Sequence, residues 1–314
     1  MTTVQNCKKW VDEAMQLLSA SDVTPERISM AMELKAKNLP AAVYKYREVS
    51  KYSLSNLRDS TLYLSSANAF NDPYDSAMIY DPLFGVSHAE ALLGEIDLSE
   101  AEKQSILSAD DPVVALVEAV IAGAEPALIN EASSMARILK EGHEKFKMEQ
   151  MIAMNAQIQS MYKICSLSER LDSLPLWAHY AKDHSGFAME YDFKSLAFSD
   201  ISSSLWPVRY VGIFDASNLL RGYKKGASFN NLFAFMAALH KSPDWSYEQE
   251  WRLVIPDGPG SPSRNFAVPL KAVYLGAKIS DVDEAKVREC AAQANVPVYR
   301  MRLVPHLFKM EAVI

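Results

Sequence analysis

The chain has 314 residues, of which 49% are hydrophobic, and its formal net charge is −7 at neutral pH. This composition supports a sizeable core and excludes extensive disorder, and the negative charge argues against a general basic surface for nucleic acid. The three cysteines are isolated in sequence, so neither a disulfide framework nor a cysteine zinc site is indicated. No apolar run is long enough to span a membrane, and the first residues lack the apolar core of a signal peptide. We therefore expect a cytoplasmic protein with no membrane contact.

Residues 3–38 predict two helices that form an N-terminal arm. The second helix begins at Pro25, with Thr24 as its N-cap. The alternating aromatic segment 43–47 then predicts a strand, Ser50 caps a short helix through Leu57, and 61–65 predicts a second strand.

A polar loop with a proline turn follows at 66–75, and residues 87–160 predict a helical insertion. Beyond it, strands are predicted at 162–167, 186–191, 208–213, 247–255, 267–270, 272–275 and 297–304. Helices are predicted at 176–181, 229–240 and 281–294. The pattern predicts an α+β fold with a mostly antiparallel sheet, divided into an arm (1–39), a catalytic core (40–86 and 161–314) and the helical insertion (87–160).

The most informative segment is Tyr247-Glu248-Gln249-Glu250-Trp251-Arg252. Because strand side chains alternate between faces, Glu248, Glu250 and Arg252 are predicted to project to one side. Two carboxylates and a cation on one face of a strand destabilise a sheet unless that face is solvated or has a function.

Three segments resemble signatures of the bacterial family called domain of unknown function 2971. The opening signature lies in Lys45-Tyr46-Arg47, Leu62 to Ser65 and Phe70 to Asp75. The middle signature lies in Leu176 to Tyr180 with His184 to Phe187, and the late one in Trp245 to Arg252. The resemblance covers roughly 43–75 and 162–255, and the family name implies no activity.

The chain also resembles, more distantly, the ADP-ribosyltransferases. Those enzymes carry a basic residue on an early strand, a serine on the next and an E-x-E or Q-x-E motif on a late one. Arg47 (or Lys45), Ser65-Ser66 and Glu248-x-Glu250 occur in that order. More residues separate Ser66 from Glu248 than in compact members of that fold, and the helical insertion accounts for the excess.

The second resemblance implies a split antiparallel sheet and NAD as substrate, with ADP-ribose transferred to a protein or nucleic acid acceptor. Such an activity fits a bacterial toxin or an anti-phage effector. In that reading Glu250 faces the developing positive charge on the ribose, Glu248 orients or deprotonates the acceptor, and Arg47 grips the pyrophosphate. The residues expected to contact NAD are Lys45, Tyr46, Arg47, Ser65, Ser66, Asn71, Trp177, His179 and Arg252.

Other chemistry-bearing residues give weaker signals. His179, Asp183 and His184 have spacing that permits metal ligation, but no third strong ligand is nearby in sequence, so we expect no metal site. Cys165 lies in an apolar strand and is expected to be inert. Arg221, Lys224 and Lys225 form a small basic cluster that fits either a solvated loop or contact with a phosphate backbone.

Two alternative functions remain open at this stage. The first is a hydrolase, either metal-dependent or glycosidic, acting on nucleic acid or nucleotides through the same acidic residues. The second is a non-enzymatic module that senses a ligand or binds an antitoxin or regulatory partner through the helical arm and insertion.

Overall fold

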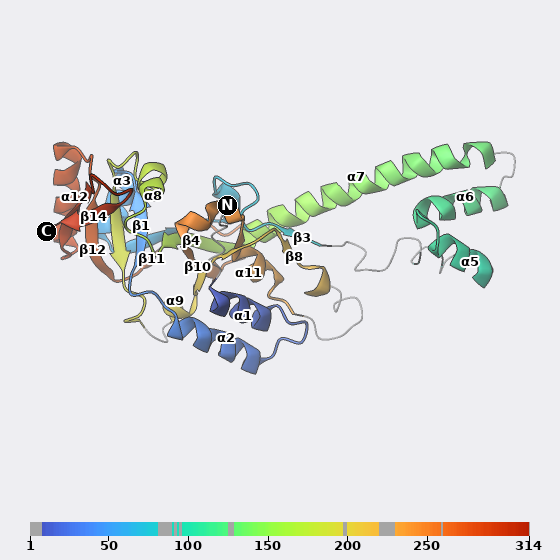
Figure 1. The fold of residues 1–314 in the computed structure, drawn as a ribbon, viewed down its shortest axis with the longest axis horizontal. Coiled ribbons are helices and arrows are strands. Elements are labelled where there is room, and N and C mark those ends of the chain that lie inside the picture. Colours follow the sequence, from blue (N-terminus) through green and yellow to red (C-terminus); the bar gives the residue numbers. More distant parts are fainter. Residues whose placement is uncertain are drawn as a thin grey trace. The chain divides into compact units, whose positions relative to one another are not determined.

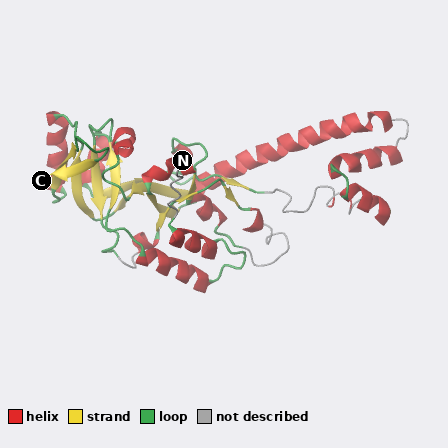
Figure 2. Cartoon of the chain, viewed as in Figure 1, coloured by secondary structure: helices red, strands yellow, loops and turns green. Residues whose placement is uncertain are grey.

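A computed structural model describes residues 8–80, 90, 93, 96–124, 129–196, 200–219, 230–258 and 260–313. They form a mixed α+β fold with a large, mostly antiparallel sheet and several helices (Figures 1 and 2). The chain divides into two compact units. The first comprises Met1–Met78, Gln157–Phe214 and Asn230–Ile314, and the second Ile79–Ala156 and Asp215–Phe229.

Two helices open the first unit, as predicted: α1 (Lys9–Leu18) and α2 (Pro25–Lys37). The Thr24 side chain accepts a hydrogen bond from the Arg27 amide, which satisfies one of the free N–H groups of the first turn of α2. Near the end of α2, Lys35 is buried and donates to the carbonyls of Ser202 and Ser203. The arm is therefore tied to the sheet-bearing part of the unit by a buried ammonium group.

The next elements also lie where they were predicted, with the bounds β1 (Val43–Arg47), α3 (Lys51–Arg58) and β2 (Thr61–Leu64). Ser50 caps α3 in a reciprocal pair with Ser53. The polar loop after β2 contains a short 3-10 turn, η1 (Ala67–Ala69), and leads to β3 (Met78–Ile79).

The second unit is helical where it is described. Its helices are α5 (Glu100–Leu107), α6 (Pro112–Ala124) and most of α7 (Ile129–Met161). The bounds 87–160 given above for a helical insertion stay a prediction. No helix in the described ranges is both long and apolar enough to cross a membrane.

The remaining elements belong largely to the first unit. Its strands are β4 (Tyr162–Ser168), β5 (Phe187–Tyr191), β6 (Leu205–Pro207), β7 (Arg209–Tyr210), β8 (Phe214–Asp215), β9 (His240–Lys241), β10 (Glu250–Pro256), β11 (Arg264–Ala267), β12 (Leu270–Leu275), β13 (Val298–Leu303) and β14 (Met310–Val313). Its helices are α8 (Leu174–Tyr180), α9 (Asp200–Ser203), α11 (Phe233–Ala238), the 3-10 helix η3 (Pro243–Glu248) and α12 (Asp281–Gln293).

The large sheet has the order β14-β13-β12-β5-β1-β4-β10-β6. Neighbouring strands are antiparallel except β12 and β13, which are parallel. A parallel pair needs a crossover connection, and α12 supplies it between these two strands.

Several predicted elements differ in the structure. The strand predicted at 208–213 is confirmed only at Arg209–Tyr210, the short strand β7, which pairs with β9 outside the large sheet. The helix predicted at 229–240 ends at Ala238, and His240–Lys241 form β9. The strand predicted from Tyr247 begins only at Glu250. In each case the predicted strand or helix is longer than the observed one, because it included a short neighbouring segment of mixed apolar and polar residues.

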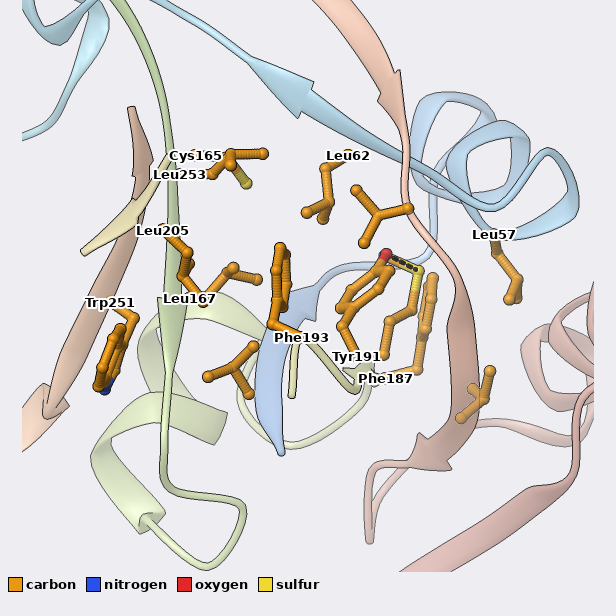
Figure 3. Close-up of a cluster of buried hydrophobic side chains, with 14 of the residues drawn as sticks. Leu57, Leu62, Cys165, Leu167, Phe187, Tyr191, Phe193, Leu205, Trp251 and Leu253 are labelled. Atoms are coloured by element: carbon orange, nitrogen blue, oxygen red, sulfur yellow. Dashed lines mark hydrogen bonds between the residues drawn. The ribbon is translucent and has the colours of Figure 1, made fainter. Parts of the chain in front are cut away.

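The larger of the buried apolar clusters lies on one face of the large sheet. Leu62 of β2, Leu167 of β4, Tyr191 of β5 and Leu253 of β10 belong to one buried apolar cluster, and Figure 3 shows their side chains converging. Along β10 the core residues alternate with Glu250 and Arg252, which therefore project to the opposite face. Glu250 and Arg252 are thus held by a strand whose other face is anchored in the core.

Candidate functional site

The large sheet opens between β1 and β4. The only registered pair between these two fully described strands is Tyr44 with Ser168, whereas β4 and β10 pair from Tyr162 to Ser168. Farther along β4, Ile164 forms a bridge with Ser65 instead. The strands β1 and β4 therefore separate after one registered pair, and residues of both strands line a cavity of about 470 Å³.

This cavity, the central cavity, collects most of the residues predicted from sequence. Those that line it are Lys45, Tyr46, Arg47, Ser65, Asn71, His179, Glu248 and Glu250. Successive residues of β1 point to opposite faces of a strand, yet Tyr44 to Arg47 all reach the cavity wall because β1 has no continuous partner on this side.

Three predicted ligand contacts do not line the central cavity. Ser66 accepts a hydrogen bond from Lys163, at 2.7 Å. Trp177 is fully buried and packs edge-on against Tyr46, with ring centroids 5.1 Å apart. Arg252 is also fully buried. Trp177 and Arg252 thus lie behind the wall and contact Tyr46 and Glu250, which do line the cavity, whereas Ser66 contacts Lys163, which does not.

Arg252 is the centre of a buried ion-pair network. Its guanidinium donates to both carboxylate oxygens of Asp75, each at 2.7 Å, and to both oxygens of Glu250 at 2.7 and 3.2 Å. It also donates to the carbonyl of Ala238 at 2.7 Å. This forked geometry uses the planar donor set of arginine and holds two carboxylates rigidly.

Lys241 joins a third carboxylate to the network. Its ammonium lies 2.7 Å from Glu248 Oε2 and 3.0 Å from Glu250 Oε2. The other oxygen of Glu248 accepts from the Tyr180 hydroxyl at 2.7 Å. The two glutamates predicted as catalytic are therefore brought to one cation, with Glu248 4% and Glu250 3% exposed.

The route by which these glutamates converge differs from the prediction. Glu248 ends η3, Gln249 has a left-handed backbone with φ of 44°, and only Glu250 belongs to a strand. Hydrogen bonds hold this bend: the Ser168 hydroxyl donates to the Glu248 carbonyl, and the Glu250 amide donates to the Tyr210 hydroxyl. Strand alternation, the stated reason for placing the carboxylates together, was wrong, although both carboxylates do line the cavity.

The environment drives the pKa values of the two glutamates in opposite directions. Burial and then repulsion from Glu250 raise the pKa of Glu248, more than Lys241 and Tyr180 lower it. Burial also acts to raise the pKa of Glu250, but attraction to Arg252 and Lys241 outweighs it and holds that pKa well below its usual range. Two neighbouring carboxyls with separated pKa values are suited to two different roles.

The cations on β1 are also unequal. Lys45 donates to the Ser166 carbonyl at 2.7 Å, and burial lowers its pKa. Arg47 makes no side-chain hydrogen bond or ion pair with any described residue, and its Nε is buried without a partner. Arg47 thus presents an unneutralised guanidinium to the cavity, whereas Lys45 is partly engaged in the wall.

A strained turn positions α8, which carries His179 and Tyr180. Lys182, Asp183 and His184 all have positive φ, at 47°, 52° and 70°. Hydrogen bonds from the Asp183 and His184 amides back to α8, and from the Lys278 amide to the His184 carbonyl, keep the turn in place. Left-handed non-glycine residues persist only where the surroundings enforce them. Asp183 and His184 therefore serve the turn, and within the described part of the chain no group of three or more potential ligands that could hold a metal ion is found.

Sequence reasoning did not select several residues of the site. Asp75 closes the predicted polar loop and clamps Arg252, while Gln159 of α7 holds the Asp75 carbonyl at 2.8 Å. Asp72, in the same loop, accepts a hydrogen bond from the Tyr74 amide at 2.9 Å. Lys241 carried no motif signal, and Tyr180 lay in the middle signature without an assigned role, because their roles depend on contacts that exist only in the folded chain. The basic cluster Arg221, Lys224 and Lys225 lies outside the described residues.

Comparison with known families supports part of this reading. A family model described as "Protein of unknown function (DUF2971)" matches residues 176–253, which include most of α8, Lys241 and both glutamates. The resemblance to that family predicted from the sequence is thereby confirmed over this segment. No curated protein and no solved structure is similar enough to the chain to count as a match.

Proposed function

We propose that this protein is an NAD-dependent ADP-ribosyltransferase that modifies a macromolecule. One observation carries the proposal: an unpaired guanidinium, that of Arg47, lines the same cavity as Glu248 and Glu250. The opening between β1 and β4 agrees with the split sheet expected for an ADP-ribosyltransferase-like fold. The cavity volume, about 470 Å³, lies within the range of small-molecule sites.

Arg47 is the group best suited to bind the pyrophosphate of NAD. A buried guanidinium nitrogen without a partner is costly, and a phosphate oxygen would satisfy it with a charge-assisted, forked hydrogen bond. Tyr63 and Phe70 lie on the wall of the same cavity and offer aromatic faces to nicotinamide or adenine. Lys45 would add a donor at its margin.

Glu250 is suited to stabilise the ribose as its bond to nicotinamide breaks. This reaction passes through an oxocarbenium-like state with positive charge on the ribose. A carboxylate that Arg252 and Lys241 keep ionised and rigid can oppose that charge without reorganising during the reaction.

Glu248 is suited to proton transfer. Burial raises the pKa of Glu248 above that of an ordinary glutamate, which makes its carboxylate a stronger base. In this scheme it accepts a proton from the incoming nucleophile, and Tyr180 and Lys241 hold its carboxylate in position.

Hydrolysis is the second candidate activity. The same two carboxylates would serve cleavage of the glycosidic bond of NAD if water were the acceptor. A metal-dependent route has less support, since no ligand cluster is found among the residues that the structure describes. A role as a toxin or anti-phage effector, cytoplasmic location and control by a partner at the helical regions are further parts of the proposal.

The test is transfer of labelled ADP-ribose from NAD to the components of a cell lysate. We expect wild type to transfer label, and Glu250→Gln to reduce the rate by about 10²–10³-fold, as for loss of a preorganised electrostatic group. Arg47→Ala should raise the KM for NAD.

Glu190→Gln is the matched control. Glu190 is 5% exposed and pairs with Lys271 at 2.9 Å on the same sheet, but it does not line the central cavity. Wild type that transfers no label, or Glu250→Gln that is no slower than Glu190→Gln, would refute the proposal. Release of free ADP-ribose without labelled acceptor would select the hydrolase.

A further inference from the structure

A second cavity adjoins the central one. It has a volume of about 510 Å³ and shares Asn71 and Lys241 with the central cavity as lining residues. Its walls come from the loop Asn71–Tyr74, the segment 211–213 and the segment 240–245. We call it the side cavity. A transfer reaction needs such a second entrance, because the acceptor must approach the ribose from a direction that nicotinamide does not occupy.

The side cavity has aromatic walls. Tyr74 is 71% exposed at its margin, and Trp245 lies on the opposite segment. Aromatic faces of this kind bind flat or cationic groups, with guanidinium groups favoured. The exposure of Tyr74 leaves its ring available to a ligand.

The accessible charge in the side cavity is negative. Asp72 and Asp244 contribute carboxylates, and no described lining residue contributes an unpaired cation. The Lys241 ammonium is neutralised by Glu248 and Glu250 and lies 4.9 Å from the Trp245 ring centre, so it adds no free positive charge. The other basic candidate, His240, is buried, and burial lowers its pKa to about 4, so its ring is neutral.

We propose that the side cavity is the acceptor site and that it takes a basic side chain of a protein, with arginine as the best fit. The inference rests on the proposed transferase function for its chemical step, but the binding itself does not. A phosphate backbone would meet two carboxylates and no free cation, and the chain as a whole carries a net charge of −7. Nucleic acid is therefore the disfavoured acceptor.

The chemical step balances with the residues present. The acceptor guanidinium gives one proton to Glu248, and the freed nitrogen lone pair forms a bond to the ribose C1 atom that carried nicotinamide. The bond from that atom to the nicotinamide ring nitrogen breaks, and its electron pair returns to the ring and removes its positive charge. Glu248 then releases the proton to solvent, so NAD and the arginine side chain yield ADP-ribosyl-arginine, nicotinamide and one proton.

Binding of a defined probe to the full chain tests this site without NAD. Acetyl-arginine-methylamide is titrated into the protein, and binding is followed by NMR. Acetyl-glutamine-methylamide and a short single-stranded RNA are titrated separately as comparison ligands. We expect saturable binding of the arginine probe alone. Tyr74→Ala and Asp244→Asn should each weaken it about two- to fivefold, as for single exposed cation–π and ion-pair contacts.

Matched variants separate the side cavity from nonspecific effects. Tyr52 is 72% exposed on α3, so Tyr52→Ala controls for loss of an exposed tyrosine, and Glu13→Gln controls for loss of an exposed carboxylate. Both variants should leave binding of the arginine probe unchanged. Binding of RNA in preference to the arginine probe, or equal weakening by Tyr52→Ala and Tyr74→Ala, would overturn the proposal. If the probe binds as expected but no label is transferred from NAD, the transferase function fails while the basic-ligand site stands.

Discussion

Replacing Arg252 with methionine should destabilise the protein strongly. Arg252 is fully buried and neutralises Asp75 and Glu250 through four hydrogen bonds of 2.7–3.2 Å. Methionine keeps much of the apolar volume but leaves these two carboxylates with Lys241 as their nearest cation. Removing one partner of a buried ion pair costs about 3–5 kcal/mol, because the remaining charge stays desolvated. We expect the free energy of unfolding to fall by about that amount, measured by urea denaturation and tryptophan fluorescence.

The pH dependence of this loss identifies its cause. In wild type the pKa of Glu250 is lowered, so its contribution to stability is present above the unfolded-state pKa and is lost as the pH falls through the folded-state value. Without Arg252, burial should dominate and raise the pKa of Glu250. The folded variant would then bind a proton more readily than the unfolded chain, so its deficit relative to wild type should shrink between pH 7 and pH 5.

Arg47→Met is the matched control for this experiment. Arg47 lines the same cavity but has no ion-pair partner among the described residues, and its Nε is buried unsatisfied. Its loss should leave stability unchanged or raise it by up to about 1 kcal/mol. The reasoning would be refuted if Arg252→Met unfolded at the wild-type urea concentration, or if Arg47→Met cost as much as Arg252→Met.

Two further predictions concern stability away from the carboxylates. Burial lowers the pKa of Lys35 to about 7, so between pH 7 and 10.5 the unfolded chain binds more protons than the folded one. The free energy of unfolding should therefore rise with pH in that window, by at most about 1.4 kcal/mol per pH unit. Urea denaturation of Lys35→Met at several pH values should lack this rise. At the turn after α8, Lys182→Gly should stabilise by about 0.5–1 kcal/mol because φ is 47°, whereas Gly186→Ala should destabilise by about 1–3 kcal/mol because its Cβ would lie 2.1 Å from the Arg47 carbonyl oxygen. Equal melting temperatures for these two variants would contradict this account of the turn.

Much of the fold was predictable because local signals agreed with it. Thr24 and Ser50 cap helices where the sequence places them, and the aromatic alternation of Val43–Arg47 forms β1. Segments such as 208–213 and 239–241 were not, because they are too short for periodicity to separate strand from helix or turn. Their conformation is decided by the strands against which they pair, which sequence alone does not reveal.

The candidate site was predictable in part for a different reason. Polar residues at the ends of apolar strands, such as Arg47 and Glu250, are visible as exceptions to the strand pattern, and both line the central cavity. Lys241 was not recognised, because its neighbours in sequence form no pattern. Its role comes from the ion pairs that it makes with Glu248 and Glu250 in the folded chain. Asp75 was passed over in favour of Asn71, since nothing local shows which polar residue of a turn faces a buried arginine.

In the E-x-E-x-R pattern the arginine has a different role from the ligand contact predicted for it. The arginine is not a ligand-binding cation but the brace that keeps Glu250 charged and fixed, with Asp75 as its second anchor. Because Arg252 and Lys241 satisfy Glu250, the repulsion that remains falls on Glu248 and raises its pKa. A single buried network therefore lowers the pKa of one carboxyl and raises that of its neighbour, beside an unpaired arginine. That asymmetry suits the proposed glycosyl transfer from a positively charged donor.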